Sequence, residues 1–153
     1  MTDKPILYRV AERASDRIFV DSNIWVYLFT DDSDAKSKAA KTFIIDNAEA
    51  SRLVISYQVV NEVCSVLKKK KYTEAEIRNV ADDMMGLCEV CNYSGEIIFI
   101  ASELREHYSF SYWDSHVVAS ALTAQCNVLA SEDMQDGLMI GTMVIRDVLN
   151  ASR

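Results

Sequence analysis

The sequence predicts an α/β fold of three layers, in which helices cover both faces of a mostly parallel central sheet. Short apolar runs typical of strands alternate with stretches of helical periodicity, in the order strand, helices, strand, helices, strand, helices, strand, strand. Acidic residues follow several of these runs, where a chain turns at the rim of a parallel sheet. Because ligands bind at the carboxyl ends of strands in open α/β sheets, these acids are the first candidates for a functional site.

Length and composition fit one globular domain. The chain has 153 residues, of which 50% are apolar and 25% charged, so it can bury a core of its own. We expect a polar N-terminal extension over residues 1–16 and a single domain over 17–150. No apolar stretch approaches the about 18 residues of a membrane span, and the N-terminus lacks the apolar core of a signal peptide. A cytoplasmic protein without a membrane partner is the default expectation.

The first half of the chain predicts two strands, each followed by helices. Apolar runs predict strands over 17–20 and 53–56, and a helical turn or two over 24–29. The second strand leads into a helix from 57 to about 70. An amphipathic helix over 34–48 is indicated by the spacing of its apolar residues, Ala39, Ala40, Phe43 and Ile44.

The second half continues the alternation. Thr73 is expected to cap a helix over 74–87, and a short strand is expected around Val90. Further apolar patterns predict a helix with a face from Ile97 to Tyr108, a helix over 113–124, and strands over 128–130 and 143–146. Gly137 and Gly141 punctuate the segment before the last strand.

Four acids are expected to meet at one edge of this sheet. Asp21 and Asp133 follow strands, and Glu62 lies early in a helix that follows a strand. Asp114 begins the helix that leads into the next parallel strand, and such a helix runs back from the same edge. Carboxylates that are distant in sequence and converge in space are what a divalent cation with oxygen ligands requires.

Each acid also has a simpler interpretation. Glu62 lies on the apolar face of its helix, where an ionised carboxylate needs a metal or a polar partner such as a Lys or a backbone donor. Asp114 could cap its helix, although it aligns with the inward face. Asp21 begins an Asp-Ser-Asn cluster in which Ser22 or Asn23 could be the cap, leaving Asp21 free. Asp133, and Asp136 even more so, could be turn residues.

Other conspicuous residues favour structural roles. The lysines at 68–71 end a helix, where cations are favoured anyway, although they could also contact phosphate. His107 and His116 lack a nucleophilic partner, and Trp25 and Trp113 are interpreted as packing anchors rather than base-stacking platforms. The cysteines are expected to be reduced and packed, since Cys-Glu-Val-Cys at 88–91 has no second such pair to complete a zinc site. The net charge of −7 argues against strong nonspecific binding to nucleic acid, unless bound cations offset the four acids.

Four short motifs carry a resemblance to a known family. They are Phe-Val-Asp21-Ser-Asn-Ile-Trp, Val-Val-Asn-Glu62-Val, Tyr-Trp-Asp114-Ser-His-Val-Val-Ala-Ser-Ala and Leu-Ala-Ser-Glu-Asp133-Met-Gln-Asp136-Gly. In this order and spacing, from about Ile18 to Arg146, the chain resembles PIN-domain proteins, and specifically the VapC-type toxins of bacterial toxin–antitoxin pairs.

The resemblance implies an endoribonuclease that depends on Mg²⁺ or Mn²⁺, hydrolyses RNA phosphodiester bonds, forms a homodimer and is inhibited by a small antitoxin protein. Asp21, Glu62, Asp114 and Asp133 match the catalytic, metal-binding acids of the family. Ser22 or Asn23, and Ser131, match supporting polar residues, and Asp136 lies beside them in the last motif. Asp21 would ligate the principal ion, Asp114 and Asp133 would do so directly or through water, and Glu62 would complete the site or orient a water.

Alternative functions remain open on the sequence. A non-catalytic PIN-like scaffold that binds RNA or protein, or a structure-specific DNA nuclease, would share the fold. A phosphatase of the haloacid-dehalogenase type would need an acid where Asn23 stands, and the acidic pair of a receiver domain would have to precede Asp31 and Asp32.

Overall fold

The computed structural model describes residues 16–31, 33–50 and 52–150, apart from the side chains of 49 and 50. Nearly all of the expected N-terminal extension, residues 1–15, lies outside the described residues. The elements in chain order are β1 (Arg17–Val20), α2 (Ser22–Phe29), α3 (Asp34–Ala50), β2 (Arg52–Ser56), α4 (Tyr57–Lys69), α5 (Glu74–Leu87), β3 (Glu89–Cys91), α6 (Gly95–His107), α7 (Tyr112–Thr123), β4 (Val128–Ala130), β5 (Met139–Ile140) and β6 (Met143–Arg146).

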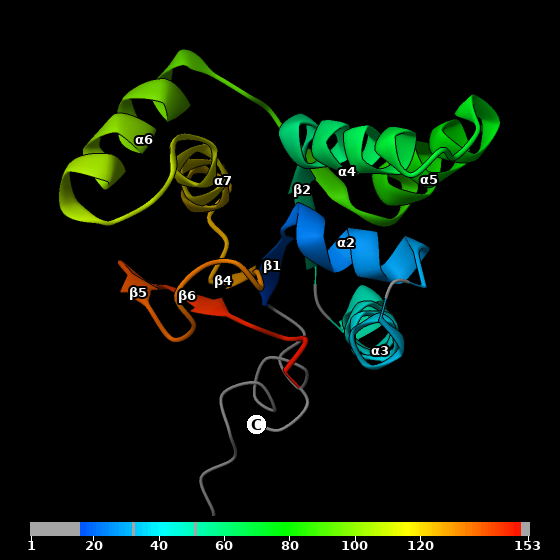
Figure 1. Ribbon diagram of the computed structural model, residues 1–153. Helices are drawn as coiled ribbons and strands as arrows, with labels where there is room; N and C mark the ends of the chain where they lie inside the picture. Colours follow the sequence, from blue (N-terminus) through cyan, green and yellow to red (C-terminus); the bar gives the residue numbers. More distant parts are fainter. Residues whose placement is uncertain (1–15, 32, 51, 151–153) are drawn as a thin grey trace, which may run out of the picture.

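These elements form the expected α/β/α arrangement. The described strands make a six-stranded sheet in the order β3-β2-β1-β4-β6-β5, parallel except for the pairing of β5 with β6. Figure 1 shows α2 to α5 on one side of the sheet and α6 and α7 on the other. The chain passes from β3 at one edge to β4 beside β1, so the strand order reverses next to β1. Such a reversal is where α/β sheets bind their ligands.

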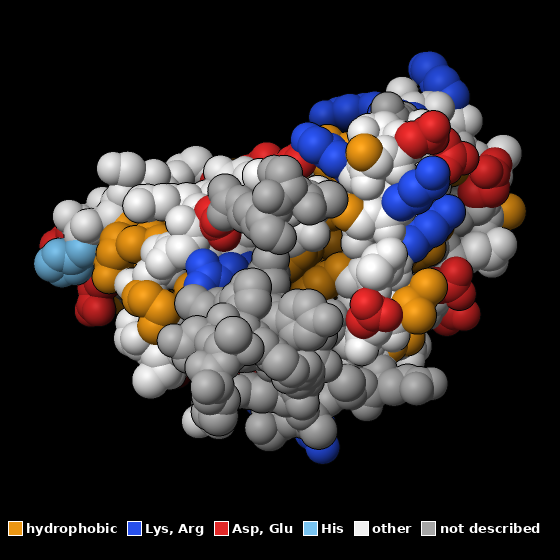
Figure 2. Space-filling model, turned by 90° about the horizontal axis from the view of Figure 1, so that it is seen from below, with side chains coloured by type: hydrophobic (Ala, Val, Ile, Leu, Met, Phe, Trp, Pro, Cys, Tyr) orange, Lys and Arg blue, Asp and Glu red, His pale blue; other side chains and the backbone are white. Residues whose placement is uncertain are grey.

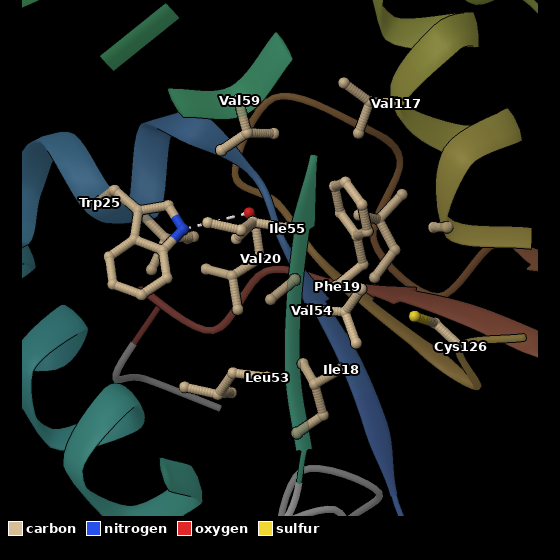
Figure 3. Close-up of a cluster of buried hydrophobic side chains, with 14 of the residues drawn as sticks. Ile18, Phe19, Val20, Trp25, Leu53, Val54, Ile55, Val59, Val117 and Cys126 are labelled. Atoms are coloured by element: carbon tan, nitrogen blue, oxygen red, sulfur yellow. Dashed lines mark hydrogen bonds between the residues drawn. The ribbon is translucent and has the colours of Figure 1, made fainter. Parts of the chain in front are cut away.

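The central strands are buried on both faces, as their continuous apolar runs predict. Ile18, Phe19 and Val20 of β1 have no exposed surface. Figure 3 shows them packed with residues of β2 and with Trp25 from α2, whose indole Nε1 donates to the Val20 carbonyl oxygen at 3.2 Å. Trp25 is fully buried and is therefore the packing anchor that the sequence suggested.

Helix starts follow the local sequence closely. Thr73 and Glu76 form a reciprocal capping box at the start of α5, which confirms Thr73 as the cap. At α2 the expectation that Ser22 or Asn23 is the cap was wrong. Asp21 has an extended backbone and is itself the cap, and its Oδ1 accepts from the Ser22 backbone nitrogen at 2.8 Å. Capping therefore uses one oxygen of the carboxylate that the sequence also predicts as a metal ligand.

Two further features differ from the expectations. The sequence did not predict β5, a two-residue strand that pairs antiparallel with β6 through a tight turn, in which Gly141 takes a φ of +60°. Trp113 is 62% exposed and so is not a packing anchor, because it lies in the first turn of α7, before the part of the helix that is covered. Within the described chain, no helix is long and apolar enough to cross a membrane.

Candidate active site

Asp21 lies at the innermost point of the carboxyl edge. Its backbone nitrogen donates to the Ala130 carbonyl at 2.9 Å, which extends the pairing of β1 with β4 by one residue. The side chain is only 3% exposed, and its Oδ2 accepts a hydrogen bond from Ser131 Oγ at 2.8 Å. Burial raises the pKa of Asp21 to about 7, the bonds from Ser131 and Ser22 oppose this rise, and the charges of Glu62 and Asp114 add to it. None of the described groups that influence the pKa of Asp21 is a cation that could neutralise its charge.

Glu62 lies in the second turn of α4, half-buried, with both carboxylate oxygens held. Ser22 Oγ donates to Oε2 at 3.1 Å, and Gln58 Nε2 donates to Oε1 at 2.7 Å. Gln58 also donates to the backbone carbonyl of Trp113 at 3.2 Å, which joins α4 to the first turn of α7. The sequence left open that Glu62 has a polar partner instead of a metal. It has two such partners, the Ser22 hydroxyl and the Gln58 amide, and both are uncharged.

Asp114 and Asp133 complete the group from α7 and from the segment after β4. Burial raises the pKa of Asp114, the Ser111 hydroxyl opposes the rise, and the negative charge of Asp133 adds to it. Asp133 is exposed, and its Oδ2 accepts from Asn23 Nδ2 at 3.0 Å. The cap of α7 is Ser111, whose hydroxyl accepts from the Asp114 backbone nitrogen. The Asp114 carboxylate is therefore not needed as a cap.

The four acids form one electrostatic group. Asp21 is influenced by the charges of Glu62 and Asp114, and Asp114 by that of Asp133. The N-terminal parts of α2, α4 and α7 meet here, and their dipoles favour negative charge. Within the described residues, no three His, Cys, Asp or Glu side chains are close enough to enclose a metal ion as they stand. The donor set nevertheless fits a hard divalent cation, because it offers oxygen ligands alone around a buried carboxylate with like-charged neighbours.

The predicted supporting residues have different surroundings. Ser22 and Ser131 hydrogen-bond to acids of the group, and Asn23 joins Asp133 to the backbone nitrogen of Glu132. Asp136 instead accepts from the Asp147 backbone nitrogen at 3.0 Å and lies 3.9 Å from the Arg146 guanidinium. These contacts tie Asp136 to the end of β6 and fit its interpretation as a turn residue.

Two grooves share Ser22 and Val66 on their borders. The larger has a volume of about 630 Å³ and is bordered by Ser22, Gln58, Asn61, Glu62, Ser65, Val66, Lys69 and Trp113. The second has a volume of about 440 Å³ and is bordered by Ser22, Asn23, Val26, Tyr27, Ser33, Lys36, Val66, Glu132 and Asp133. Two of the four acids, Glu62 and Asp133, border these grooves.

Sequence reasoning missed Gln58, Lys36 and the exposed position of Trp113. Gln58 lies four residues before Glu62 on the same helix, a spacing at which side chains meet, so the signal was present. Lys36 pairs with Glu132 at 2.5 Å, and no local pattern indicates a contact between α3 and the segment after β4.

The other conspicuous groups have structural surroundings. His116 is buried and its Nδ1 lies 2.9 Å from the Tyr93 hydroxyl, whereas His107 is exposed. All four cysteines are free, and burial raises the pKa of Cys88 and Cys126 to about 12, as for packed thiols. Figure 2, seen from below, shows basic and acidic side chains interspersed on the visible described part of that face. It thus shows no large positive surface for a nucleic-acid backbone there.

Comparison with known proteins places this chain in a family. Residues 18–135 match the family model of the PIN domain. Among curated proteins, none matches the chain significantly.

Three solved structures share the fold, each with a TM-score of 0.64. Mycobacterium tuberculosis VapC20, described as a sarcin-ricin loop cleaving toxin, is 18% identical, with 76% of this chain and 89% of that chain covered. Rickettsia felis VapBC2, bound to a DNA fragment from its promoter, is 17% identical over 85% and 97% of the two chains. A toxin–antitoxin complex from Klebsiella pneumoniae is 21% identical over 83% and 95%. The family model covers β1 from Ile18 onward, β2 to β4, the helices α2 to α7 and all four acids, and the chain belongs to the PIN domain family.

Proposed function

We propose that this protein is an endoribonuclease dependent on Mg²⁺ or Mn²⁺ and acts as the toxin of a toxin–antitoxin pair. The observation that carries the proposal is the buried Asp21 carboxylate, which has two hydrogen-bond donors, negatively charged neighbours and a pKa raised to about 7. A buried acid with acidic neighbours is unfavourable unless a cation or a proton neutralises it. Family membership and the fold of VapC toxins support nuclease chemistry at this edge of the sheet.

The chain offers oxygen ligands for the cation from Asp21, Asp114 and Asp133. Asp21 is the central ligand, because Ser131 and the Ser22 backbone nitrogen fix its orientation. When bound, a divalent cation at carboxylates supplies an activated water and stabilises charge on the phosphodiester and the leaving oxygen. The described chain provides no Ser–His or Cys–His pair near the acids that would act as a nucleophile instead.

Glu62 differs from the other acids in having both oxygens engaged. Its bonds to Ser22 and Gln58 hold the carboxylate in one orientation. A fixed carboxylate next to the ligands can accept a hydrogen bond from the attacking water and hold it in line with the phosphorus atom. We assign this orienting role to Glu62.

A ribonuclease assay with Asp21→Asn tests the proposal. Loss of the central ligand removes several kcal/mol of transition-state stabilisation, so cleavage should fall at least about 100-fold at saturating Mg²⁺. Asp82→Asn is the matched control, since Asp82 is an exposed acid of α5 outside the group. Undiminished cleavage by the Asp21 variant, or cleavage by the wild type in excess EDTA, contradicts the proposal.

The same assay separates the substrate classes. Single-stranded RNA, single-stranded DNA and flap DNA of one sequence are offered to the wild type. We expect cleavage of RNA alone, and preferential cleavage of DNA would contradict the ribonuclease assignment. A chain that binds RNA and cleaves none of the three would be a scaffold.

The partners are part of the proposal. Two of the similar structures are complexes described by their antitoxin or VapBC names, which supports a small antitoxin partner for this chain. We also propose a homodimer in the cytoplasm. A small reading frame next to the gene is expected on this proposal, and light scattering of the purified protein, alone and with the product of that frame, measures both. A monomer that binds no such product would contradict this part of the proposal.

A further inference from the structure

Trp113 exposes its indole beside the acids. The residue is 62% exposed and borders the larger groove together with Glu62 and Lys69. Its neighbour in sequence is Asp114, one of the four acids. Tyr112, which is 51% exposed, contacts the Trp113 ring, so the two form a continuous exposed aromatic patch at the border of the groove. Continuous exposed patches of this kind mark binding surfaces.

The ring is held in place before any ligand arrives. Tyr112 meets it edge-on, with centroids 5.0 Å apart and an interplanar angle of 85°, and His116 lies 5.3 Å away. Gln58 fixes the Trp113 backbone carbonyl, and Tyr93 hydrogen-bonds His116 from behind. An aromatic ring that is already ordered loses little conformational entropy on binding.

The groove also offers a cation. Lys69 borders it and is exposed, and no ion pair of Lys69 is found among the described residues, whereas Lys68 pairs with Glu74 at 2.6 Å. The remaining border is mainly polar, with Asn61, Ser65 and Gln58. An aromatic face, an ammonium group and a carboxylate site in one groove match a nucleotide, whose base stacks and whose phosphate is anionic. The ammonium group favours RNA over an apolar segment of a protein.

We propose that Trp113 is the stacking platform for an unpaired base of the RNA next to the scissile phosphate, with Lys69 contacting a neighbouring phosphate. The inference rests on the proposed ribonuclease function and adds two residues that would position the substrate beside the acids. A base must leave its duplex to present a face to Trp113. Stacking tolerates every base, so this contact selects for unpaired structure rather than for sequence.

Kinetics of Trp113 variants provide the first test. Stacking contributes about 1–3 kcal/mol per base, so Trp113→Ala should lower kcat/KM roughly 10- to 100-fold, mainly through a higher KM. Trp113→Phe should restore much of the loss, because it keeps a stacking ring. Phe99→Ala is the matched control, since Phe99 is a 72% exposed ring of α6 that does not border the groove. Unchanged kinetics of Trp113→Ala on single-stranded RNA would overturn the proposal.

An abasic substrate identifies the partner of the ring. Oligoribonucleotides that each lack one base near the cleavage site are cleaved by the wild type and by Trp113→Ala. At one flanking position, removing the base should slow cleavage by the wild type as much as Trp113→Ala slows cleavage of the intact RNA. Removing the same base should not slow the variant any further. Equal abasic penalties in both proteins at every position would show that no base stacks on Trp113. The exposed ring would then be assigned to a protein contact.

A binding assay separates this proposal from the proposed function. RNA that carries 2-aminopurine at the flanking position is titrated with wild-type protein in EDTA, and stacking quenches its fluorescence. If the wild type cleaves no RNA but quenches the probe, and Trp113→Ala does not, the ribonuclease function fails and the platform stands. Absence of quenching by a wild type that does cleave RNA overturns the platform alone.

Discussion

Asp21 and Asp133 are the same residue type beside neighbouring parallel strands, yet their surroundings differ strongly. Asp21 is buried, caps α2 and receives two fixed hydrogen bonds, which together do not prevent its pKa from rising to about 7. Asp133 is exposed and receives one bond, from the Asn23 amide. Asp21 is thus an inner acid whose side chain is already held in one orientation and whose charged form is unfavourable without a cation. Asp133 is an outer acid whose side chain can change position when a ligand binds.

The largest effect predicted from this contrast is on the stability of the metal-free protein. Asp21 has a pKa of about 7 when folded against 3.8 as the reference for the unfolded chain. At pH values between these two pKa values, the folded state binds more protons than the unfolded state. The free energy of unfolding therefore falls as the pH rises, and this loss is complete above about pH 7. Asp21→Asn should therefore be more stable than wild type at pH 8, by up to about 4 kcal/mol, and should lack this pH dependence. Urea unfolding in EDTA at pH 4.5, 6 and 8 measures the difference.

Asp133→Asn is the control for that experiment. Its profile should run close to that of the wild type, because Asp133 is exposed and is not among the charged groups that raise the pKa of Asp21. A stability difference between wild type and Asp21→Asn that is constant across these pH values would mean that Asp21 is not strained by its charge.

Ser131→Ala should have an intermediate effect. The Ser131 hydroxyl is buried and donates to Asp21, which lowers its pKa. Without it, protons compete more strongly with the cation, so half-maximal cleavage should need about 10- to 100-fold more Mg²⁺, and the shift should be larger at pH 6.5 than at pH 8. Ser102→Ala, at an exposed position of α6, should behave as wild type. An unaltered Mg²⁺ dependence at both pH values would remove Ser131 from the site.

Asn23→Ala should have the smallest effect. It removes the amide that holds the exposed Asp133 and the Glu132 backbone nitrogen. Because Asp133 remains free to reach a cation through solvent, we expect kcat/KM to fall by less than about tenfold, the scale of one modest hydrogen bond. Cleavage assays at saturating Mg²⁺ give the ratio. A loss as severe as that of Asp21→Asn would show that the outer acid is as constrained as the inner one.

Local sequence determined the regular elements well. The β1, β4 and β6 runs are apolar on both faces and bounded by polar residues, so their limits were predicted correctly. The Thr73–Glu76 box marked the start of α5. The two-residue strand β5 carries too few residues for a pattern and depends on the β6 pairing and the Gly141 turn.

The placement of the four acids at one edge was predictable, whereas their metal-binding roles stay a prediction. The rim positions of the four acids follow from strand order alone. Which member of Asp21-Ser22-Asn23 caps α2 depends on the backbone angles of Asp21, which sequence does not reveal. The prediction that Trp113 is a packing anchor was wrong. Helical periodicity shows which side of a helix is apolar, but not how far along its length the helix is covered, and the first turn of α7 is largely exposed.

A crystal structure with Mn²⁺ tests the central claim most directly, because the anomalous signal of manganese locates the ion independently of activity. We predict a peak within bonding distance of oxygens of Asp21 and of at least one of Asp114 and Asp133, and no such peak in Asp21→Asn. A crystal grown or soaked at saturating Mn²⁺ that shows no manganese at Asp21, or shows the ion only elsewhere on the chain, would contradict the account.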